Sequence, residues 1–368
     1  MNNRFLLVCF VISLTITSGI PSNSQETNRI IPRILSTDFF DNIESVSFSP
    51  NGSVLASGTS EPRIKIWNVS NGELLFKTTG HSYTINTIKF SKDGSVFVSG
   101  SRGENLQVWN SSTFELLRTI DFGLGGTDSL IFLSDNQTII CNLDGKLIYT
   151  NYINGSTLAE IPVNRSYAIY SIDISPDESL LLTGSQDDTI KLWDVESKSL
   201  IRTLTNHTDV VNSVTFSPNG KFFASGSSDK TIKLWNTSSG ALISTMTGHT
   251  FPVMTLAFSP DGRYLFSGST DATIKVWRLS DGANVLTLTA HSDSVFTLAV
   301  SPNGKILASG SADEHILLWD IEEIIEVGDS FPMSTTTTST SAVTSFSTLV
   351  FLSSLSVLTL IVNLKKKR

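Results

Sequence analysis

Six tryptophans recur along the chain at a constant interval, and this period restricts the possible folds more than any other feature of the sequence. The interval is 42 residues throughout, except for one gap of 84, and the tryptophans are Trp67, Trp109, Trp193, Trp235, Trp277 and Trp319. In the long gap the segment DGKLIYTNYINGS, around Thr150, keeps the turn residues but lacks the tryptophan. Seven repeats therefore cover residues 29–326. A fixed period of this length indicates a stacked array in which no single repeat can bury its apolar face alone.

Each repeat predicts four short β-strands. In the repeat VNSVTFSPNGKFFASGSSDKTIKLWNTSSGALISTMTGH, apolar and polar residues alternate in four runs, separated by the turn sequences SPNG, SSDK and TSSG. Four strands joined by tight turns form one antiparallel sheet. Seven such sheets packed radially make an all-β propeller.

The phrases TGH, FSPDG, SGS followed by D, and W followed by D or N recur at this period, and they resemble the WD40-repeat family. The resemblance covers roughly 300 of the 368 residues. It implies a seven-bladed β-propeller of four-stranded antiparallel blades in which the first sequence repeat starts within a blade. Residues Ile31 to Ser36 would then supply the missing outer strand of the last blade, with Pro32 on an edge strand.

Three repeats carry histidine, serine and aspartate at constant spacing, a combination also found in hydrolase triads. A nucleophile is needed once, whereas this set recurs, and the resemblance implies an internal hydrogen-bonded chain that ends on the tryptophan. The sets are His207, Ser225, Asp229, Trp235; His249, Ser267, Asp271, Trp277; and His291, Ser309, Asp313, Trp319.

The other repeats depart from this set. Gly103 replaces the aspartate beside His81, and Arg165 replaces the histidine of the fourth repeat. The first repeat has Phe39 and Glu61 in the histidine and aspartate positions, and the third keeps Asp144 alone. We therefore expect blades one and three to be the least rigid.

Composition excludes several function classes. A net charge of -8 and the absence of a basic stripe argue against a nucleic-acid partner. The five histidines have no metal-ligand spacing, and no glycine-rich phosphate loop opens a helix. We expect no cofactor, no metal and no enzymatic activity.

The two ends of the chain predict export. Residues 1–24 have the order of a signal peptide: a positive start, an apolar run and small residues. A Ser/Thr-rich stalk follows the repeats at 330–346, and residues 342–364 form an apolar segment that predicts a transmembrane helix or a sorting tail. The basic end 365–368 would be cytoplasmic. The propeller would then lie on the cell surface, although the resemblance alone implies a cytosolic or nuclear adaptor.

We therefore predict a non-enzymatic protein-protein interaction scaffold, displayed on the extracytoplasmic face of a membrane, with an unknown protein or peptide partner. Aromatic and charged loop residues are the partner-binding candidates: Tyr83, Arg102, Tyr167, Asp209, Phe251 and Asp293. One alternative is an extracellular propeller hydrolase, lactonase-like or glycosidase-like. It would need clustered carboxylates or a metal at the channel mouth, whereas Asp41, Asp209 and Asp293 lie two or more blades apart. Another is an architectural component of a surface layer.

Overall fold

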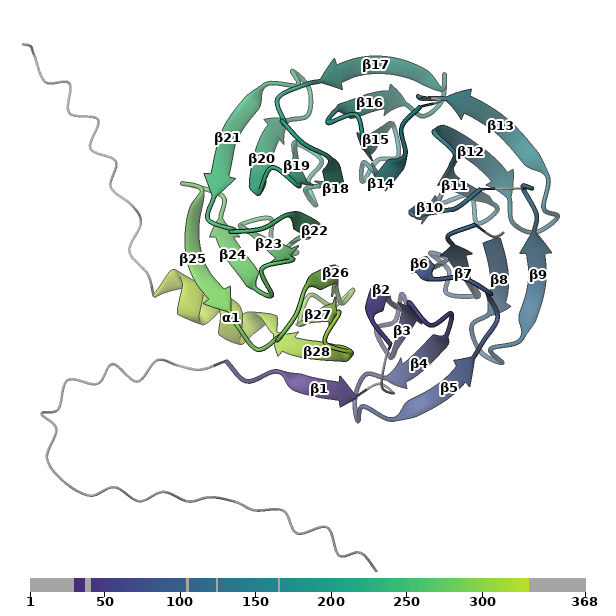
Figure 1. Ribbon diagram of the computed structural model, residues 1–368, viewed down its shortest axis with the longest axis horizontal. Helices are drawn as coiled ribbons and strands as arrows, with labels where there is room; N and C mark the ends of the chain where they lie inside the picture. Colours follow the sequence, from purple (N-terminus) through teal and green to yellow (C-terminus); the bar gives the residue numbers. More distant parts are fainter. Residues whose placement is uncertain (1–29, 37–40, 104–105, 124, 165, 331–368) are drawn as a thin grey trace, which may run out of the picture. The chain divides into compact units, whose positions relative to one another are not determined.

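A computed structural model of the chain describes residues 30–36, 41–103, 106–123, 125–164 and 166–330. In these residues seven four-stranded antiparallel sheets are arranged around a central channel (Figure 1), which confirms the predicted all-β, seven-bladed propeller. The predicted signal peptide, stalk and membrane segment lie outside the described residues. Within the described part, no helix has the length and apolar character needed to cross a membrane.

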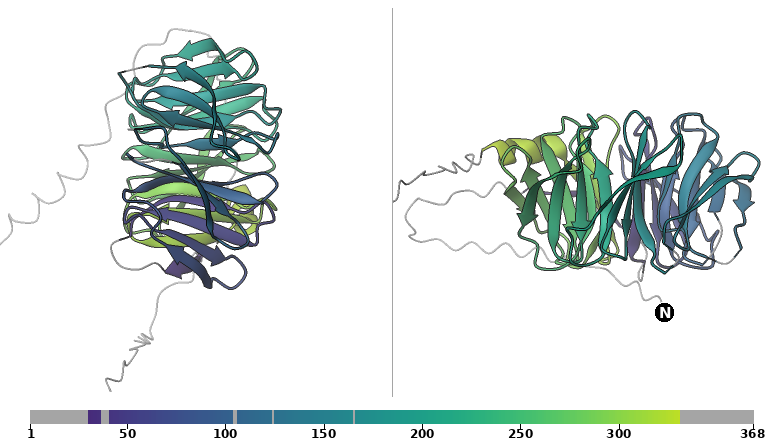
Figure 2. Two further views of the ribbon diagram at one scale, coloured as in Figure 1. Left: turned by 90° about the vertical axis from the view of Figure 1, so that its right-hand side faces the viewer. Right: turned by 90° about the horizontal axis from the view of Figure 1, so that it is seen from above.

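Each blade runs outward from the channel in chain order. Blades one to four consist of β2 (Ile43–Phe48), β3 (Val54–Thr59), β4 (Ile64–Asn68), β5 (Leu74–Thr78); β6 (Ile85–Phe90), β7 (Val96–Ser101), β8 (Leu106–Asn110), β9 (Leu116–Ile120); β10 (Leu130–Phe132), β11 (Thr138–Leu143), β12 (Lys146–Asn151), β13 (Thr157–Pro162); and β14 (Ile169–Ile174), β15 (Leu180–Ser185), β16 (Ile190–Asp194), β17 (Ser199–Leu204). Blades five and six consist of β18 (Val211–Phe216), β19 (Phe222–Ser227), β20 (Thr231–Asn236), β21 (Leu242–Thr247); and β22 (Val253–Phe258), β23 (Tyr264–Ser269), β24 (Ile274–Arg278), β25 (Ala283–Leu288). The two side views in Figure 2 show the blades side by side in a short cylinder.

The seventh blade is assembled from both ends of the repeat region. It combines β26 (Val295–Val300), β27 (Ile306–Ser311) and β28 (His315–Asp320) with β1 (Arg33–Ser36), which is its outer strand. β1 pairs antiparallel with β28, from Arg33 opposite Leu318 to Ser36 opposite His315. The ring is therefore closed by the N-terminal strand that the sequence pattern had indicated.

A helix that the sequence analysis did not predict follows the last blade. α1 (Ile321–Asp329) begins at Asp320, whose side chain accepts hydrogen bonds from the N–H groups of Glu322 and Glu323. Ile321 and Ile324 are buried, and the helix contacts β25 and β28. In Figure 1 it runs from the end of β28 towards β25, at the junction of blades six and seven.

Neighbouring blades are joined along the channel by hydroxyl groups of the innermost strands. In six of the junctions a Ser or Thr accepts a hydrogen bond from a backbone N–H of the next blade: Ser45 from Ile88, Ser129 from Ile172, Ser171 from Val214, Ser213 from Leu256, Thr255 from Leu298 and Thr297 from Val46. The bond from Val46 to Thr297, at 3.2 Å, closes the ring between the seventh blade and the first. These hydroxyl groups are part of the scaffold and fix the spacing of the strands that line the channel.

Candidate functional site

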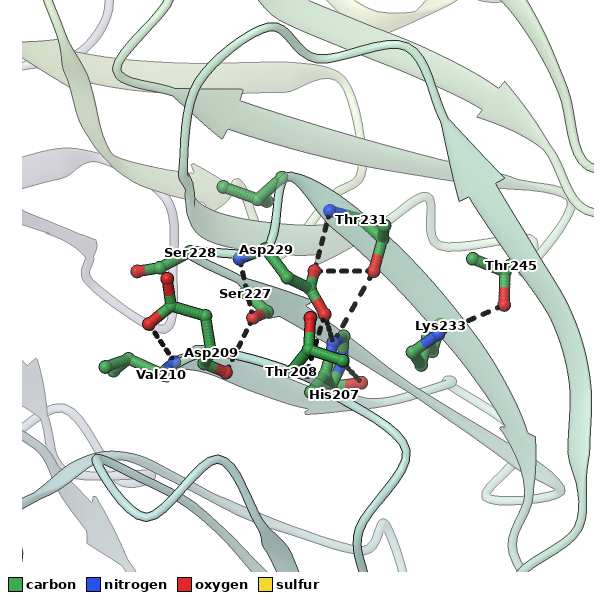
Figure 3. A network of polar contacts seen from close by, with 12 residues as sticks. His207, Thr208, Asp209, Val210, Ser227, Ser228, Asp229, Thr231, Lys233 and Thr245 are labelled. Atoms are coloured by element: carbon green, nitrogen blue, oxygen red, sulfur yellow. Dashed lines mark hydrogen bonds and ion pairs between the residues drawn. The ribbon is translucent and has the colours of Figure 1, made fainter.

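The repeated polar residues form a continuous hydrogen-bonded chain inside each complete blade. In blade five the Trp235 indole N–H donates to Ser225 Oγ at 2.9 Å, and Ser225 Oγ lies 2.7 Å from His207 Nε2. His207 Nδ1 lies 2.7 Å from Asp229 Oδ2, and Figure 3 shows Asp229 between His207 and Thr231. With the proton on Nδ1, the neutral imidazole donates to the carboxylate and accepts from the serine, so every member of the chain is satisfied.

Blades six and seven repeat this geometry. The indole N–H to serine distances are 2.8 and 2.9 Å, the serine to histidine distances are 2.7 Å, and the histidine to aspartate distances are 2.8 Å. The serines Ser225, Ser267 and Ser309 are fully buried. A serine nucleophile must meet its substrate, so these buried sets act as internal supports of the blades and not as catalytic triads.

These chains should make the protein sensitive to acid. Burial alone would raise the pKa of Asp313, but hydrogen bonds and the field of His291 hold the pKa of this carboxyl at about 2. The pKa of Asp229 is lowered in the same way, and burial lowers the pKa of His249. The unfolded chain takes up protons on histidine below about pH 6.5 and on aspartate near pH 4, so it binds more protons than the folded chain.

We therefore predict that the contribution of these chains to the free energy of unfolding falls as the pH decreases from 6.5 to 2. Asp313 alone contributes about 2 kcal/mol, present above pH 4 and lost as the pH falls towards 2. Urea unfolding at fixed pH steps measures this slope. The variant Asp313→Asn should be less stable at pH 7 and show a shallower loss between pH 4 and pH 2; an unchanged slope would contradict the assignment.

The first blade replaces the histidine chain with a buried ion pair. Asp41 is fully buried, and its carboxylate lies 2.6 Å from Lys65 Nζ and 2.7 Å from Arg63 Nη1. The sequence pattern had assigned Asp41 to a loop position, but the structure buries its side chain. Asp41 is therefore not among the carboxylates that the alternative hydrolase would need to be clustered at the channel mouth. Arg63 could have indicated this ion pair in the sequence, because repeats four to six have threonine at the equivalent position and the first repeat has a cation there.

The third blade lacks the serine and the tryptophan of the chain. The strand register places Cys141 where other blades have the serine, and Thr150 where they have tryptophan. Cys141 is buried, and burial raises the pKa of its thiol to about 12. Because the serine and the tryptophan are both replaced, neither is left without the other as a hydrogen-bond partner. The low rigidity of blades one and three stays a prediction.

Blades two and four keep part of the chain. In blade two His81 Nε2 lies 2.7 Å from Ser99 Oγ, which accepts from Trp109 at 2.9 Å. In blade four the Trp193 indole donates to Thr183 at 3.2 Å. Arg165 lies outside the described residues. The Asp187 carboxylate instead accepts from Asn164 and Lys191.

The channel opens at one end into a cavity of about 640 Å³ that the sequence analysis missed. Among its lining residues, one position recurs in every blade, again at intervals of 42. These residues are called here the mouth ring: Glu44, Asn86, Asp128, Tyr170, Asn212, Met254 and Phe296. Acidic and amide side chains come from blades one, two, three and five, whereas blades six and seven contribute apolar ones. The 42-residue period could have identified this ring, had it been followed along the first strand of each repeat.

The two carboxyl groups on the polar side of the mouth ring have raised pKa values. Burial raises the pKa of Glu44 and of Asp128, and the Arg102 guanidinium opposes both shifts. Asn86 Nδ2 donates to Asp128 Oδ1 at 2.6 Å. Carboxyl groups with raised pKa values in a cavity are typical of functional sites.

A second charged pair lies deeper in the channel. Lys89 and Asp173 line both the mouth cavity and a cavity of about 440 Å³ at the other end. Burial raises the pKa of Asp173, although its carboxylate accepts from the Phe216 N–H at 2.7 Å. The loss of hydration between the strands that line the channel lowers the pKa of Lys89, and the negative charge of the Asp173 carboxylate opposes this shift. Because the Lys89 side chain stays in contact with channel solvent, the solvent limits the size of that shift.

The structure places the predicted partner-binding residues on the same end of the propeller as the mouth ring. The loops that carry them are held together by backbone bonds such as Arg102 N–H to Thr84 O at 3.0 Å. Arg102 lines the mouth cavity. The other five are exposed on separate loops around it: Tyr83, Tyr167, Asp209, Phe251 and Asp293. Their role in binding stays a prediction.

The mouth cavity can hold a polar group on one side and an apolar group on the other. The described residues contain no cluster of three side chains suited to a metal ion. Asp128 and Asp173 are each engaged by a hydrogen-bond donor of the protein, from Asn86 and Phe216. The protein itself therefore supplies one hydrogen-bond donor to each of these two carboxylates.

Comparison with known sequences agrees with the repeat pattern. Residues 34–68 and 72–110 match the WD domain, G-beta repeat, and residues 169–350 match the second beta-propeller of the Echinoderm microtubule-associated protein family. The chain contains WD40 repeats. The two matched segments run from β1 to β4 and from β5 to β8 of the seven-bladed propeller.

Several WD40 proteins are similar to parts of the chain. A WD repeat domain-containing protein 83 homolog of Dictyostelium discoideum is 21% identical over 155 residues, 42% of this chain and 35% of that protein. The WD repeat-containing protein 18 of Mus musculus is 33% identical over 81 residues, 22% of this chain and 18% of that protein. Nuclear distribution protein nudF 1 of Talaromyces marneffei is 26% identical over 166 residues, 45% of this chain and 28% of that protein. The chain thus spans about a third or less of the length of these relatives.

Proposed function

We propose that the protein is a non-enzymatic interaction scaffold whose protein or peptide partner binds at the mouth ring. One observation carries this proposal. The positions next to the mouth ring are Ser or Thr in all seven repeats: Ser45, Thr87, Ser129, Ser171, Ser213, Thr255 and Thr297. The mouth ring itself holds six different residue types in seven positions. A repeat protein keeps its scaffold constant and varies the residues that meet the partner.

The mouth ring also suggests what the partner offers. Tyr170 and Phe296 supply aromatic surface, which is enriched at the centres of protein interfaces. Glu44 and Asp128 supply acceptors beside the Arg102 guanidinium. A partner segment with an apolar side chain next to a hydrogen-bonding group would fit both sides.

Truncation of the aromatic anchors should therefore abolish capture of the partner. We predict that the double variant Tyr170→Ala, Phe296→Ala binds at least about 30-fold more weakly, because even one interface hot spot carries about 2 kcal/mol or more. The measurement is quantitative affinity capture by the full chain from its own cells. The control is Val300→Ala, which truncates a side chain at the other end of the channel and should leave partner capture unchanged. Equal recovery of partners by wild type and double variant would overturn the proposal.

We further propose that the propeller is displayed on the extracytoplasmic face of a membrane and anchored through residues 342–364. The support is the order of the two chain ends, an N-terminal apolar leader and a C-terminal apolar segment followed by basic residues. Protease treatment of intact cells tests this. Peptides from residues 43–320 should be released before lysis, and their release only after lysis would contradict the proposal.

A further inference from the structure

Hollows repeat where neighbouring blades meet, at the end of the propeller opposite the mouth ring. The hollow between blades four and five has a volume of about 570 Å³ and is lined by Leu180, Pro218, Lys221, Phe222 and Thr237, among others. The equivalent hollow between blades seven and one has about 510 Å³, and Arg33 of β1 projects into its wall. None of the residues around the first hollow lines the mouth cavity.

Between blades six and seven the chain fills the corresponding place with its own helix. Positions 84 residues apart are equivalent, which relates Leu180 to Tyr264, Phe222 to Ile306 and Thr237 to Ile321. The backbone confirms this relation, because Thr237 N–H bonds to Lys221 O as Ile321 N–H bonds to Lys305 O. After Thr237 the chain turns into β21, whereas after Ile321 it continues as α1.

α1 shows what such a place accepts. Ile321 and Ile324 are buried against Tyr264 and Val285 in one apolar cluster. A Cβ added at Gly328 would lie 3.2 Å from Val285 Cγ2, so the glycine lets the helix approach β25 closely. The Tyr264 hydroxyl donates to the Asp329 carboxylate.

The same surface is uncovered at blades four and five. Val285 is 4% exposed under α1, whereas the equivalent Ile201 on β17 is 48% exposed and its neighbour Leu200 is 47% exposed. The Thr237 side-chain oxygen is buried and has no hydrogen-bond partner within the described residues. A buried hydroxyl left unsatisfied is costly, so this position favours an incoming polar group.

The charges around this hollow complement a helix like α1. α1 carries acidic side chains in its first turn and on its exposed face, at Glu322, Glu323 and Glu326. Lys221 lines the hollow between blades four and five, opposite a single acid, Asp177. Arg202 of β17 donates to the Ser239 carbonyl oxygen, which places its guanidinium at the same junction.

We propose that the hollow between blades four and five binds an acidic amphipathic α-helix of a partner protein, seated as α1 is seated between blades six and seven. The partner helix offers apolar side chains one turn apart to Phe222, Leu180 and Ile201, and its acidic side chains face Lys221 and Arg202. This surface is separate from the mouth ring. The protein would then hold two partners, or two parts of one partner, at once.

A helical peptide with the sequence of residues 320–330 is the probe. It keeps Glu322, Glu323 and Glu326 and is stapled through positions 325 and 329, because an isolated helix this short is marginal in water. The contact of Asp329 with Tyr264 is not needed here, since Leu180 holds the equivalent position in blade four. Fluorescence anisotropy with the full chain measures its affinity. We expect Ile201→Asp to weaken binding about tenfold, as loss of one buried aliphatic side chain implies.

Ile243→Asp is the matched control, because Ile243 has the same position in blade five and the same exposure of 48%. Lys221→Glu is a second variant that lies in an exposed turn, and it should also weaken binding. Hydrogen exchange should show protection at residues 175–180, 218–222 and 236–238. Equal losses from both isoleucine variants, no binding, or protection confined to blades six and seven would overturn the proposal. So would a wild-type dimer that Ile201→Asp dissociates, because the occupant would then be a second copy.

Discussion

Replacing Asp41 by alanine should lower the free energy of unfolding by about 3–5 kcal/mol, the typical cost of breaking a buried ion pair by removing one partner. The Lys65 side chain is 1% exposed, and its ammonium lies 2.6 Å from the Asp41 carboxylate. Water cannot replace that carboxylate without opening blade one. The loss therefore exceeds that of an exposed pair such as Lys146 with Glu160. Urea unfolding at pH 7 measures it.

The control for this prediction removes both charges. In the double variant Asp41→Ala, Lys65→Met the buried ammonium is gone, so most of the lost stability should return. Glu160→Ala on blade three should change the unfolding free energy by less than about 1 kcal/mol. A loss below 1 kcal/mol for Asp41→Ala would contradict the assignment of this pair as a support of blade one.

Replacing Ser267 by alanine should cost about 2–4 kcal/mol. Ser267 Oγ accepts from the Trp277 indole at 2.8 Å and lies 2.7 Å from His249 Nε2. Its removal leaves a buried N–H and a buried ring nitrogen without their partner, and each such group costs about 1–3 kcal/mol. The variant should unfold at lower urea concentration and exchange the amides of β22 to β25 faster than wild type.

Ser280→Ala is the control in the same repeat, because Ser280 is exposed and should change stability by less than about 0.5 kcal/mol. Partner capture by Ser267→Ala should equal that of wild type under conditions where both are folded. If Ser267→Ala kept the stability of wild type but lost partner capture, the hydrogen-bonded set would have a direct role in binding. The account of this set as an internal support of the blade would then be wrong.

The sequence predicted the parts of the molecule that repeat. The tryptophan period, the four strand patterns and the offset of Ile31 to Ser36 together determine a closed ring, because each blade can bury its apolar face only against its neighbours. Constant spacing identified the residues of the set around His207, and the resemblance to WD40 repeats implied that they are joined by hydrogen bonds. These features depend on local pattern, which a single sequence displays.

What the sequence did not predict depends on departures from the pattern. Asp41 was placed in an exposed loop because its partners, Arg63 and Lys65, are more than 20 residues away and meet it only when blade one folds. The helix α1 begins where the repeat pattern ends. The mouth ring was missed because Glu44, Tyr170 and Phe296 have no residue type in common, and only their period connects them.

The most direct test of the central claim, that the partner binds at the mouth ring, is site-specific photocrosslinking in the native cell. A photoreactive phenylalanine analogue is placed at Tyr170 or Phe296 of the mouth ring, and as controls at Ala299 at the other end of the channel and at the buried Trp277. The account predicts a discrete covalent adduct from Tyr170 and Phe296, of the same mass in both, and none from Ala299 or Trp277. Adducts from Ala299 with none from the mouth ring would contradict it.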